Sequence, residues 1–131
     1  MILEKDPICF NHNLETVERL QKEVRRGANY KKSLSLLKKS KDIAPHIQTK
    51  SGIMLGLGET LDEIKNTIYD LKKIDCDQIT IGQYLRPSLN HLAVKKYWDP
   101  LEFEYLYRSS MELGFKKVSS GPLVRSSYHA G

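Results

Sequence analysis

Short apolar runs alternate along this chain with longer stretches whose apolar residues recur at helical spacing. Four runs have the length of strands: 8–10, 51–58, 79–85 and 115–118. Helical spacing covers four longer stretches: 14–24, 30–44, 61–71 and 100–113. This alternation predicts an α/β fold, with a parallel sheet and helices packed outside it. The pattern alone leaves two architectures open, a flavodoxin-like open sheet and a piece of a β/α barrel.

Polar residues mark the starts of the predicted helices. Asn13 is the expected N-cap of the first helix, and Thr60 with Glu63 gives a capping box ahead of the third. Asp99 and Pro100 begin the fourth helix. The residues expected to face the core from the last three helices are Leu34, Leu37, Ile43, Leu61, Ile64, Ile68, Leu71, Phe103, Leu106, Tyr107 and Met111.

The chain length of 131 residues suits one domain, and its 40% apolar content can form a real core. No run of about 18 apolar residues occurs, so we expect no membrane span. The N-terminus lacks the basic and long apolar regions of a signal peptide. These observations predict a soluble, cytoplasmic protein without a membrane partner.

The net charge of +5 comes from 21 basic and 16 acidic residues. Such a balance can suit an anionic partner such as nucleic acid. Many of the lysines, however, lie on the outer faces of predicted helices, as in YKKSLSLLKKSK at 30–41. We favour a solvated basic face and expect no nucleic-acid partner. A basic nucleic-acid-binding module stays open as an alternative, although no aromatic-basic platform accompanies the charge.

Three polar clusters directly follow predicted strands. They are Asn11-His12-Asn13 with Glu15 and Thr16, Gly56-Leu57-Gly58-Glu59, and Gly82-Gln83-Tyr84-Leu85-Arg86-Pro87. Because parallel strands end at one edge of a sheet, we expect the clusters to converge on one cleft. The long connection 86–99 extends from the same edge. From the residues alone, the chain is an α/β domain with a polar cleft that suits a nucleotide-like ligand.

Four strings at these positions resemble lipoyl synthases. They are FNHNLETV (10–17), SGIMLGLGET (51–60), IGQYLRPS (81–88) and SGPLVRSSYHA (120–130). The second also fits the G-x-[IM]-x-G-x-x-E pattern in the fifth strand of radical S-adenosylmethionine barrels. The resemblance covers essentially the whole chain. It implies the C-terminal part of a partial β/α barrel over 1–119 and a C-terminal tail with the RSSYHA motif over 120–131.

Lipoyl synthases are sulfurtransferases that insert two sulfur atoms into an octanoyl chain carried on a lysine. The resemblance implies two 4Fe–4S clusters and S-adenosyl-L-methionine as cofactors. One cluster with S-adenosylmethionine generates a 5′-deoxyadenosyl radical, which abstracts hydrogen, and the auxiliary cluster is consumed as the sulfur source. The implied partners are an octanoylated lipoyl carrier domain or protein and an iron–sulfur cluster supply protein.

The resemblance also suggests individual site residues. The candidates for cofactor contacts are Asn11, Asn13, Glu15, Gly52, Met54, Gly56, Glu59, Gln83, Tyr84 and Arg86. Glycines in this strand would let the backbone approach an adenine ring closely. In the family the first serine of the R-S-S motif completes the auxiliary cluster, so Ser126 is the implied metal ligand. Oxygen is an unusual ligand for such an iron, which would make Ser126 a release point during sulfur transfer. No catalytic residue is assigned.

The two cysteines, Cys9 and Cys76, are too far apart to form a C-x-x-C pair, and we expect both to be packed thiols. They cannot replace the family's two cysteine triplets, which have no counterpart here. We therefore expect a chain that lacks both clusters and is inactive by itself, with an unpaired barrel edge. The alternative is an inactive half-barrel that retains only nucleotide or S-adenosylmethionine binding.

Overall fold

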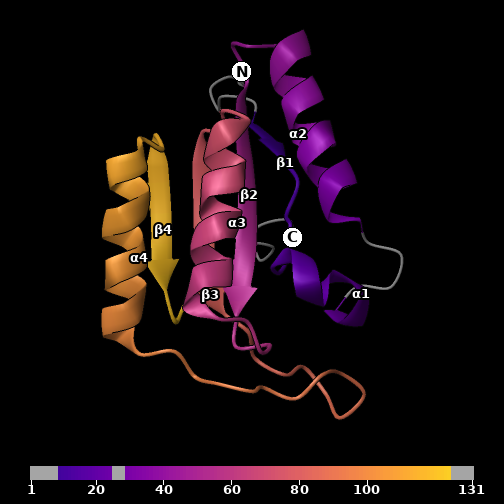
Figure 1. The fold of residues 1–131 in the computed structure, drawn as a ribbon, viewed down its shortest axis with the longest axis vertical. Helices are drawn as coiled ribbons and strands as arrows, with labels where there is room; N and C mark the ends of the chain where they lie inside the picture. The colour runs from indigo at the N-terminus through magenta and orange to yellow at the C-terminus, as the bar shows by residue number, and fades with distance from the viewer. Residues whose placement is uncertain (1–8, 25–28, 125–131) are drawn as a thin grey trace, which may run out of the picture.

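The computed structural model describes residues 9–24 and 29–124. Within these ranges one sheet holds four parallel strands in the order β1-β2-β3-β4 (Figure 1). The strands are β1 Cys9–Asn11, β2 Gln48–Leu55, β3 Gln78–Gln83 and β4 Lys117–Gly121. The helices are η1 Glu18–Leu20, α1 Gln21–Val24, α2 Tyr30–Ile43, α3 Leu61–Lys73 and α4 Pro100–Leu113.

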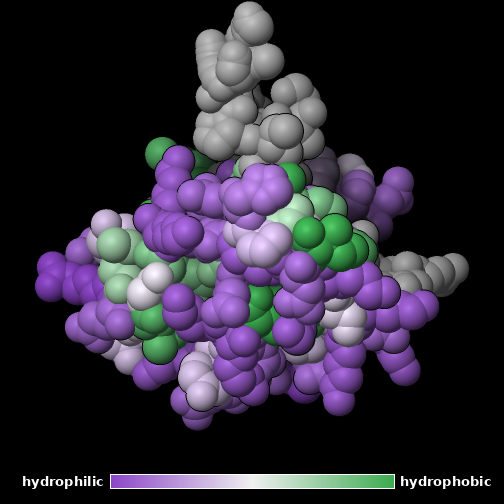
Figure 2. Space-filling view, turned by 90° about the horizontal axis from the view of Figure 1, so that it is seen from above, coloured by the Kyte–Doolittle hydropathy of each residue, from purple (hydrophilic) through white to green (hydrophobic). Residues whose placement is uncertain are grey.

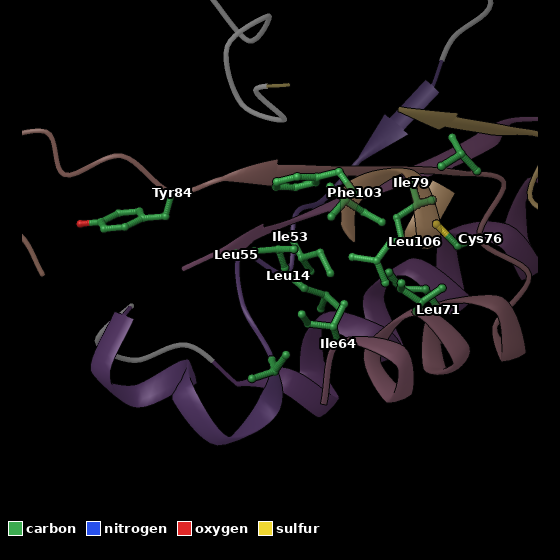
Figure 3. Packing of buried hydrophobic residues seen from close by; sticks show 14 of the residues in the cluster. Leu14, Ile53, Leu55, Ile64, Leu71, Cys76, Ile79, Tyr84, Phe103 and Leu106 are labelled. Atoms are coloured by element: carbon green, nitrogen blue, oxygen red, sulfur yellow. The ribbon is translucent and has the colours of Figure 1, made fainter. Parts of the chain in front are cut away.

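The strand order settles which of the two architectures applies. A flavodoxin-like sheet reverses its strand order and carries helices on both faces. Here neighbouring strands follow one another along the chain. Because parallel crossovers are right-handed, α2, α3 and α4 fall on the same side of the sheet (Figures 1 and 3). This is the arrangement of a β/α barrel portion, so the predicted α/β class and barrel piece are confirmed.

Strand alternation separates an apolar face from a polar one. Ile53 and Leu55 of β2 and Ile79 of β3 point toward the helices (Figure 3). These three side chains are at most 1% exposed. Ile64 and Leu71 of α3 pack against them. The opposite face of β2 and β3 carries polar or small residues, among them Lys50, Gly52, Gln78, Thr80 and Gly82. This second face corresponds to the interior of a barrel.

The predicted starts of α3 and α4 are confirmed in detail. Thr60 Oγ1 accepts a hydrogen bond from Glu63 N, and the Glu63 side chain accepts one from Thr60 N. Asp99 and Glu102 form the same reciprocal pair ahead of α4. These caps fix where each helix leaves the C-terminal edge of the sheet.

The expected first helix from residue 14, capped by Asn13, was wrong. Helical structure begins only at Glu18, with Val17 before it. The preceding segment instead runs along β2, because Glu15 N donates to Gly52 O and Met54 N donates to Glu15 O. Backbone pairing with the neighbouring strand therefore decides the conformation of this segment, and Glu15 takes a φ of 74° to make both bonds.

Four residues that we expected in the core are exposed. They are Ile43, Leu61, Tyr107 and Met111, at 76%, 38%, 37% and 42%. In α4 the inward positions are Phe103, Leu106 and Ser110, so the helix presents a narrower side to the sheet than its apolar residues suggest. Ile43 is the last residue of α2 and Leu61 the first of α3, and side chains at helix ends are less enclosed than those at the middle.

Two further features concern the surface. The end of the molecule at which the strands begin is mainly hydrophilic (Figure 2). In the ranges 9–24 and 29–124, no helix combines the length and apolarity needed to cross a bilayer.

Candidate functional site

The polar clusters predicted from the sequence meet at the C-terminal edge of the sheet. The segment after β1 pairs with β2 through Glu15. At the ends of β2 and β3, Tyr84 N donates to Leu55 O at 2.8 Å. Lys95 N, from the long connection after β3, donates to Gly56 O at 2.7 Å. The predicted convergence is thus present in the geometry.

Glu59 is the central side chain of this edge. It is 7% exposed, and its Oε2 accepts hydrogen bonds from Gly56 N at 2.7 Å and Trp98 Nε1 at 2.8 Å. Its Oε1 accepts from Leu57 N at 3.0 Å. Three donors compensate the loss of water around a buried carboxylate. Both oxygens already bind the chain itself, so Glu59 supports the glycine turn rather than presenting a free acceptor.

The glycine turn explains why Gly56 and Gly58 are glycines. Their φ angles are 112° and 113°, a region that side chains disfavour. A Cβ on Gly56 would lie 2.6 Å from Lys96 O and would also collide with the Gln83 amide. We expected a close approach of an adenine ring at such glycines. At Gly56 the group that approaches closely is the protein's own connection.

Gln83, Tyr84 and Arg86 all attach the connection between β3 and α4. Gln83 Nε2 donates to Lys96 O at 2.9 Å, and its Oε1 accepts from Trp98 N at 3.0 Å. Tyr84 Oη donates to Leu92 O at 2.7 Å. Arg86 donates to the carbonyls of Leu89 and His91, each at 2.9 Å. The three side chains therefore fix the course of the connection.

Sequence reasoning missed two residues of this edge. Trp98, the single tryptophan of the chain, is 5% exposed and ties the connection to Glu59. The Lys96 ammonium lies 3.7 Å from the centroid of the Trp98 ring. Arg19 forms two hydrogen bonds with Glu63, at 2.7 and 3.0 Å, and donates to Gly58 O at 2.8 Å. The hydrogen bonds from Arg19 hold the pKa of Glu63 down at about 2.

The remaining site candidates lie at the end of β1, directly after it, and on the inner face of the sheet. Asn11 is exposed, and Gly52 and Met54 lie on the inner face, paired with Thr80 and Gly82. Five buried side-chain oxygens have no hydrogen-bond partner among the residues that the structure describes: those of Asn13, Thr16, Thr49, Thr80 and Ser110. Of these, Thr80 lies on the inner face and Asn13 and Thr16 follow β1. Unpaired buried polar atoms are uncommon in folded proteins and call for a donor or acceptor from elsewhere.

The described residues do not fit an iron–sulfur cluster. Across 9–24 and 29–124, no three His, Cys, Asp or Glu side chains gather in a metal-binding group. Burial raises the pKa of the Cys76 thiol to about 11 and also raises that of Cys9. A thiol that resists ionisation is a poor metal ligand, which agrees with the predicted packed thiols. Ser126, the expected metal ligand, lies outside the described residues.

Comparison with known proteins identifies the relatives of this chain. Lipoyl synthase 2 from Prochlorococcus marinus subsp. pastoris is 80% identical over 130 residues, which are 99% of this chain and 44% of that protein. Lipoyl synthase 2 from a Nostoc species is 58% identical over 100% of the chain and 44% of its own length. A lipoyl synthase from Hydrogenovibrio crunogenus is 54% identical over 99% of the chain and 41% of its own length. No protein-family model matches the chain.

These matches confirm the resemblance predicted from the four strings, since they run along almost the whole chain. The chain spans less than half the length of the curated relatives that it matches.

Proposed function

We propose that this chain, similar along its whole length to lipoyl synthases, forms the later strands of a lipoyl synthase barrel. The activity to which it contributes is the radical-mediated insertion of two sulfur atoms into a protein-bound octanoyl chain. The observation that carries this proposal is 54–80% identity over nearly all of the chain to proteins of that name. The proposal includes the cytoplasm as the location and an iron–sulfur cluster supply protein and an octanoylated carrier as partners.

Within this function, the inner face at the C-terminal edge is the S-adenosylmethionine side. Gly52 and Met54 line that face, and the orphaned Asn13 Oδ1 and Thr80 Oγ1 suit the amine and hydroxyl groups of this cofactor. When bound, S-adenosylmethionine supplies the radical chemistry of the reaction. The residues of this chain would bind and orient it, and Glu59 would hold the turn beneath it.

Asn11 and Glu15 are proposed to border the same ligand from the strand beside β2. Gln83, Tyr84 and Arg86 act indirectly, because their hydrogen bonds go to the connection. The C-terminal tail is proposed to reach the site as well. A Cβ on Gly82 would collide with the carbonyl of Val124, so the chain crosses the end of β3 just before Arg125 and the proposed ligand Ser126.

Trp98 offers a direct test of cofactor binding. It is the single tryptophan and is bonded to Glu59, so its fluorescence reports on the glycine turn. Titration with S-adenosylmethionine is expected to change that fluorescence with micromolar affinity. Asn13→Ala is expected to weaken binding roughly tenfold, as the loss of one well-placed hydrogen bond does. Asn66→Ala, on the outer helix layer, is the matched control. No binding by fluorescence or calorimetry would contradict the proposed cofactor side.

Anaerobic reconstitution with iron and sulfide tests whether this chain alone can bind a 4Fe–4S cluster, as an enzyme that works by itself would have to do. We expect iron counting and absorbance to show no stable 4Fe–4S cluster on this chain alone, because its two cysteines cannot supply a cluster. A stable cluster that supports sulfur insertion would contradict that expectation. Binding of S-adenosylmethionine without any gain of activity in a complete barrel would instead favour the half-barrel alternative.

A further inference from the structure

The connection between β3 and α4 exposes large apolar side chains that are not part of the hydrophobic core. Leu85, Leu89, Leu92 and Tyr97 are 42%, 86%, 38% and 69% exposed. All four lie within one irregular segment at the C-terminal edge of the sheet (Figure 1). Exposed leucines and tyrosines gathered on one loop are typical of contact surfaces.

The same segment is positively charged. Arg86, Lys95 and Lys96 lie in it, and the sequence has no Asp or Glu from Gln78 to Trp98. Among the described residues, only one of these three side chains forms an ion pair: Lys96 Nζ lies 3.5 Å from a carboxylate oxygen of Glu102. The positive charge of Arg86 and Lys95 is therefore available to an anionic group from outside.

The connection is held in place before any partner binds. Tyr84 Oη bonds to Leu92 O, Gln83 Nε2 bonds to Lys96 O, and Lys95 N bonds to Gly56 O. Ser88 Oγ and His91 Nδ1 lie 2.9 Å apart. A segment fixed in this way loses little conformational entropy on binding, which favours its use as a docking surface.

We propose that residues 85–97 form the docking surface for the protein that carries the octanoyl chain, and that this carrier presents an acidic face to it. The inference rests on the proposed function. The connection lies at the edge that holds the candidate site, so a carrier docked there would have its acylated lysine beside the site. Complementary charge would steer the encounter, and the exposed leucines and Tyr97 would supply the apolar contacts.

The side chains favour a protein over a nucleic acid as the occupant. Single-stranded nucleic acids are held by aromatic rings on which several bases stack. The large exposed apolar residues of the connection are three leucines and one tyrosine. Leucines contribute to protein contacts and offer no stacking surface to bases.

A pair of matched double variants tests this surface. Leu89→Asp with Lys95→Glu changes the connection, and Leu36→Asp with Lys39→Glu makes the same chemical change on the outer side of α2. Leu36 is 44% exposed and Lys39 is also exposed. The binding of a labelled, octanoylated lipoyl carrier domain is measured at low and high salt. The connection variant is expected to bind roughly tenfold more weakly, the α2 variant within about twofold of the parent, and salt is expected to weaken the parent.

Equal binding by both double variants would overturn the proposed surface, and so would a parent chain that does not bind the carrier domain. An RNA oligonucleotide that binds the parent as tightly, with the same loss in the connection variant, would overturn the assignment to a protein partner. The Trp98 titration with S-adenosylmethionine is run on all three proteins. Because it reports on the proposed function separately, the docking surface can fail while cofactor binding stands.

Discussion

Glu59 shows at the scale of one residue how a sequence motif and its structural role differ. The motif marks the residue, but its three donors come from Gly56, Leu57 and the distant Trp98. The last of these contacts joins residues that are 39 positions apart. The sequence could identify the glycine turn and its carboxylate, whereas the connection that closes over them depends on tertiary packing.

Replacing Glu59 by Gln should loosen the turn. The amide nitrogen cannot accept a hydrogen bond, so at least one buried donor loses its partner, at about 1–3 kcal/mol in the free energy of unfolding. Urea unfolding measures the loss, and the Trp98 emission should shift toward that of a hydrated indole. Glu104→Gln, in an exposed pair with Arg108, is the control and should change stability by less than about 1 kcal/mol. Equal stability losses would contradict the role given to Glu59.

The two glycines of the turn allow strain and packing to be separated. Alanine at Gly58 should cost about 1–2 kcal/mol for its backbone conformation, since its Cβ would meet only Lys95 Cδ at 3.5 Å. Alanine at Gly56 has the same backbone problem and also collides with Gln83 and Lys96, which adds about 1–3 kcal/mol. Urea midpoints of the two variants should therefore differ. A Gly58 variant as unstable as the Gly56 variant would count against the close packing of the connection.

At the scale of elements, the spacing of apolar residues was enough to predict strands, helices and their order. It failed where other contacts decide the outcome. Residues 12–15 pair with β2 instead of starting a helix, because the strand edge offers backbone partners. Tyr107 and Met111 lie on α4 but outside its buried side, because the spacing of apolar residues does not reveal how wide that side is. Ser110, polar and fully buried, occupies an inward position that no hydrophobic pattern indicates.

Asp77 connects several elements at the opposite edge of the sheet. Its side chain accepts hydrogen bonds from Lys41 of α2 at 2.7 Å and Thr49 of β2 at 2.8 Å. Lys116, just before β4, lies 3.5 Å away. Burial opposes ionisation of Asp77, but the hydrogen bonds from Lys41 and Thr49 and the nearby ammonium charges outweigh it and hold the pKa below the usual 3.8.

The lowered pKa predicts how stability depends on pH. The stabilisation from Asp77 is fully present above its unfolded value of 3.8 and is lost as the pH falls through the lower folded pKa. Asp77→Asn should destabilise the protein at neutral pH by roughly 2 kcal/mol, and the difference from the parent should shrink in acid. Urea unfolding across this range measures both. Asp42→Asn, in an exposed pair with Lys38, should show little effect at either pH. A constant difference between Asp77→Asn and the parent would contradict the assigned ionisation.

At the scale of the whole molecule, the fold class and the convergence of the polar clusters followed from two facts about parallel sheets. Successive strands lie side by side, and their C-terminal ends share one edge. What could not be derived is which polar groups stay free for a ligand. Gln83 and Glu59 looked available in the sequence and are occupied by the chain. Asn13, named both as a helix cap and as a candidate for cofactor contacts, caps no helix and has an unpaired buried oxygen among the described residues.

Ser126 stays a prediction from the sequence. In a complete barrel, Ser126→Cys should hold the auxiliary cluster more firmly and slow sulfur transfer, because thiolate binds this iron more strongly than an alcohol oxygen does. The measurement is the rate of sulfur insertion, with iron content as the control for cluster assembly. Unchanged transfer at full iron content would count against a release point at Ser126.

The most direct test of the central claim is a chimera of this chain with its 80% identical relative. The 130 matching residues of the Prochlorococcus lipoyl synthase are replaced by those of this chain, and sulfur insertion into an octanoylated carrier domain is measured under anaerobic conditions. The account predicts a folded chimera that loads both clusters and inserts sulfur at a rate comparable to that of the relative. A folded, cluster-loaded chimera that inserts no sulfur would contradict it.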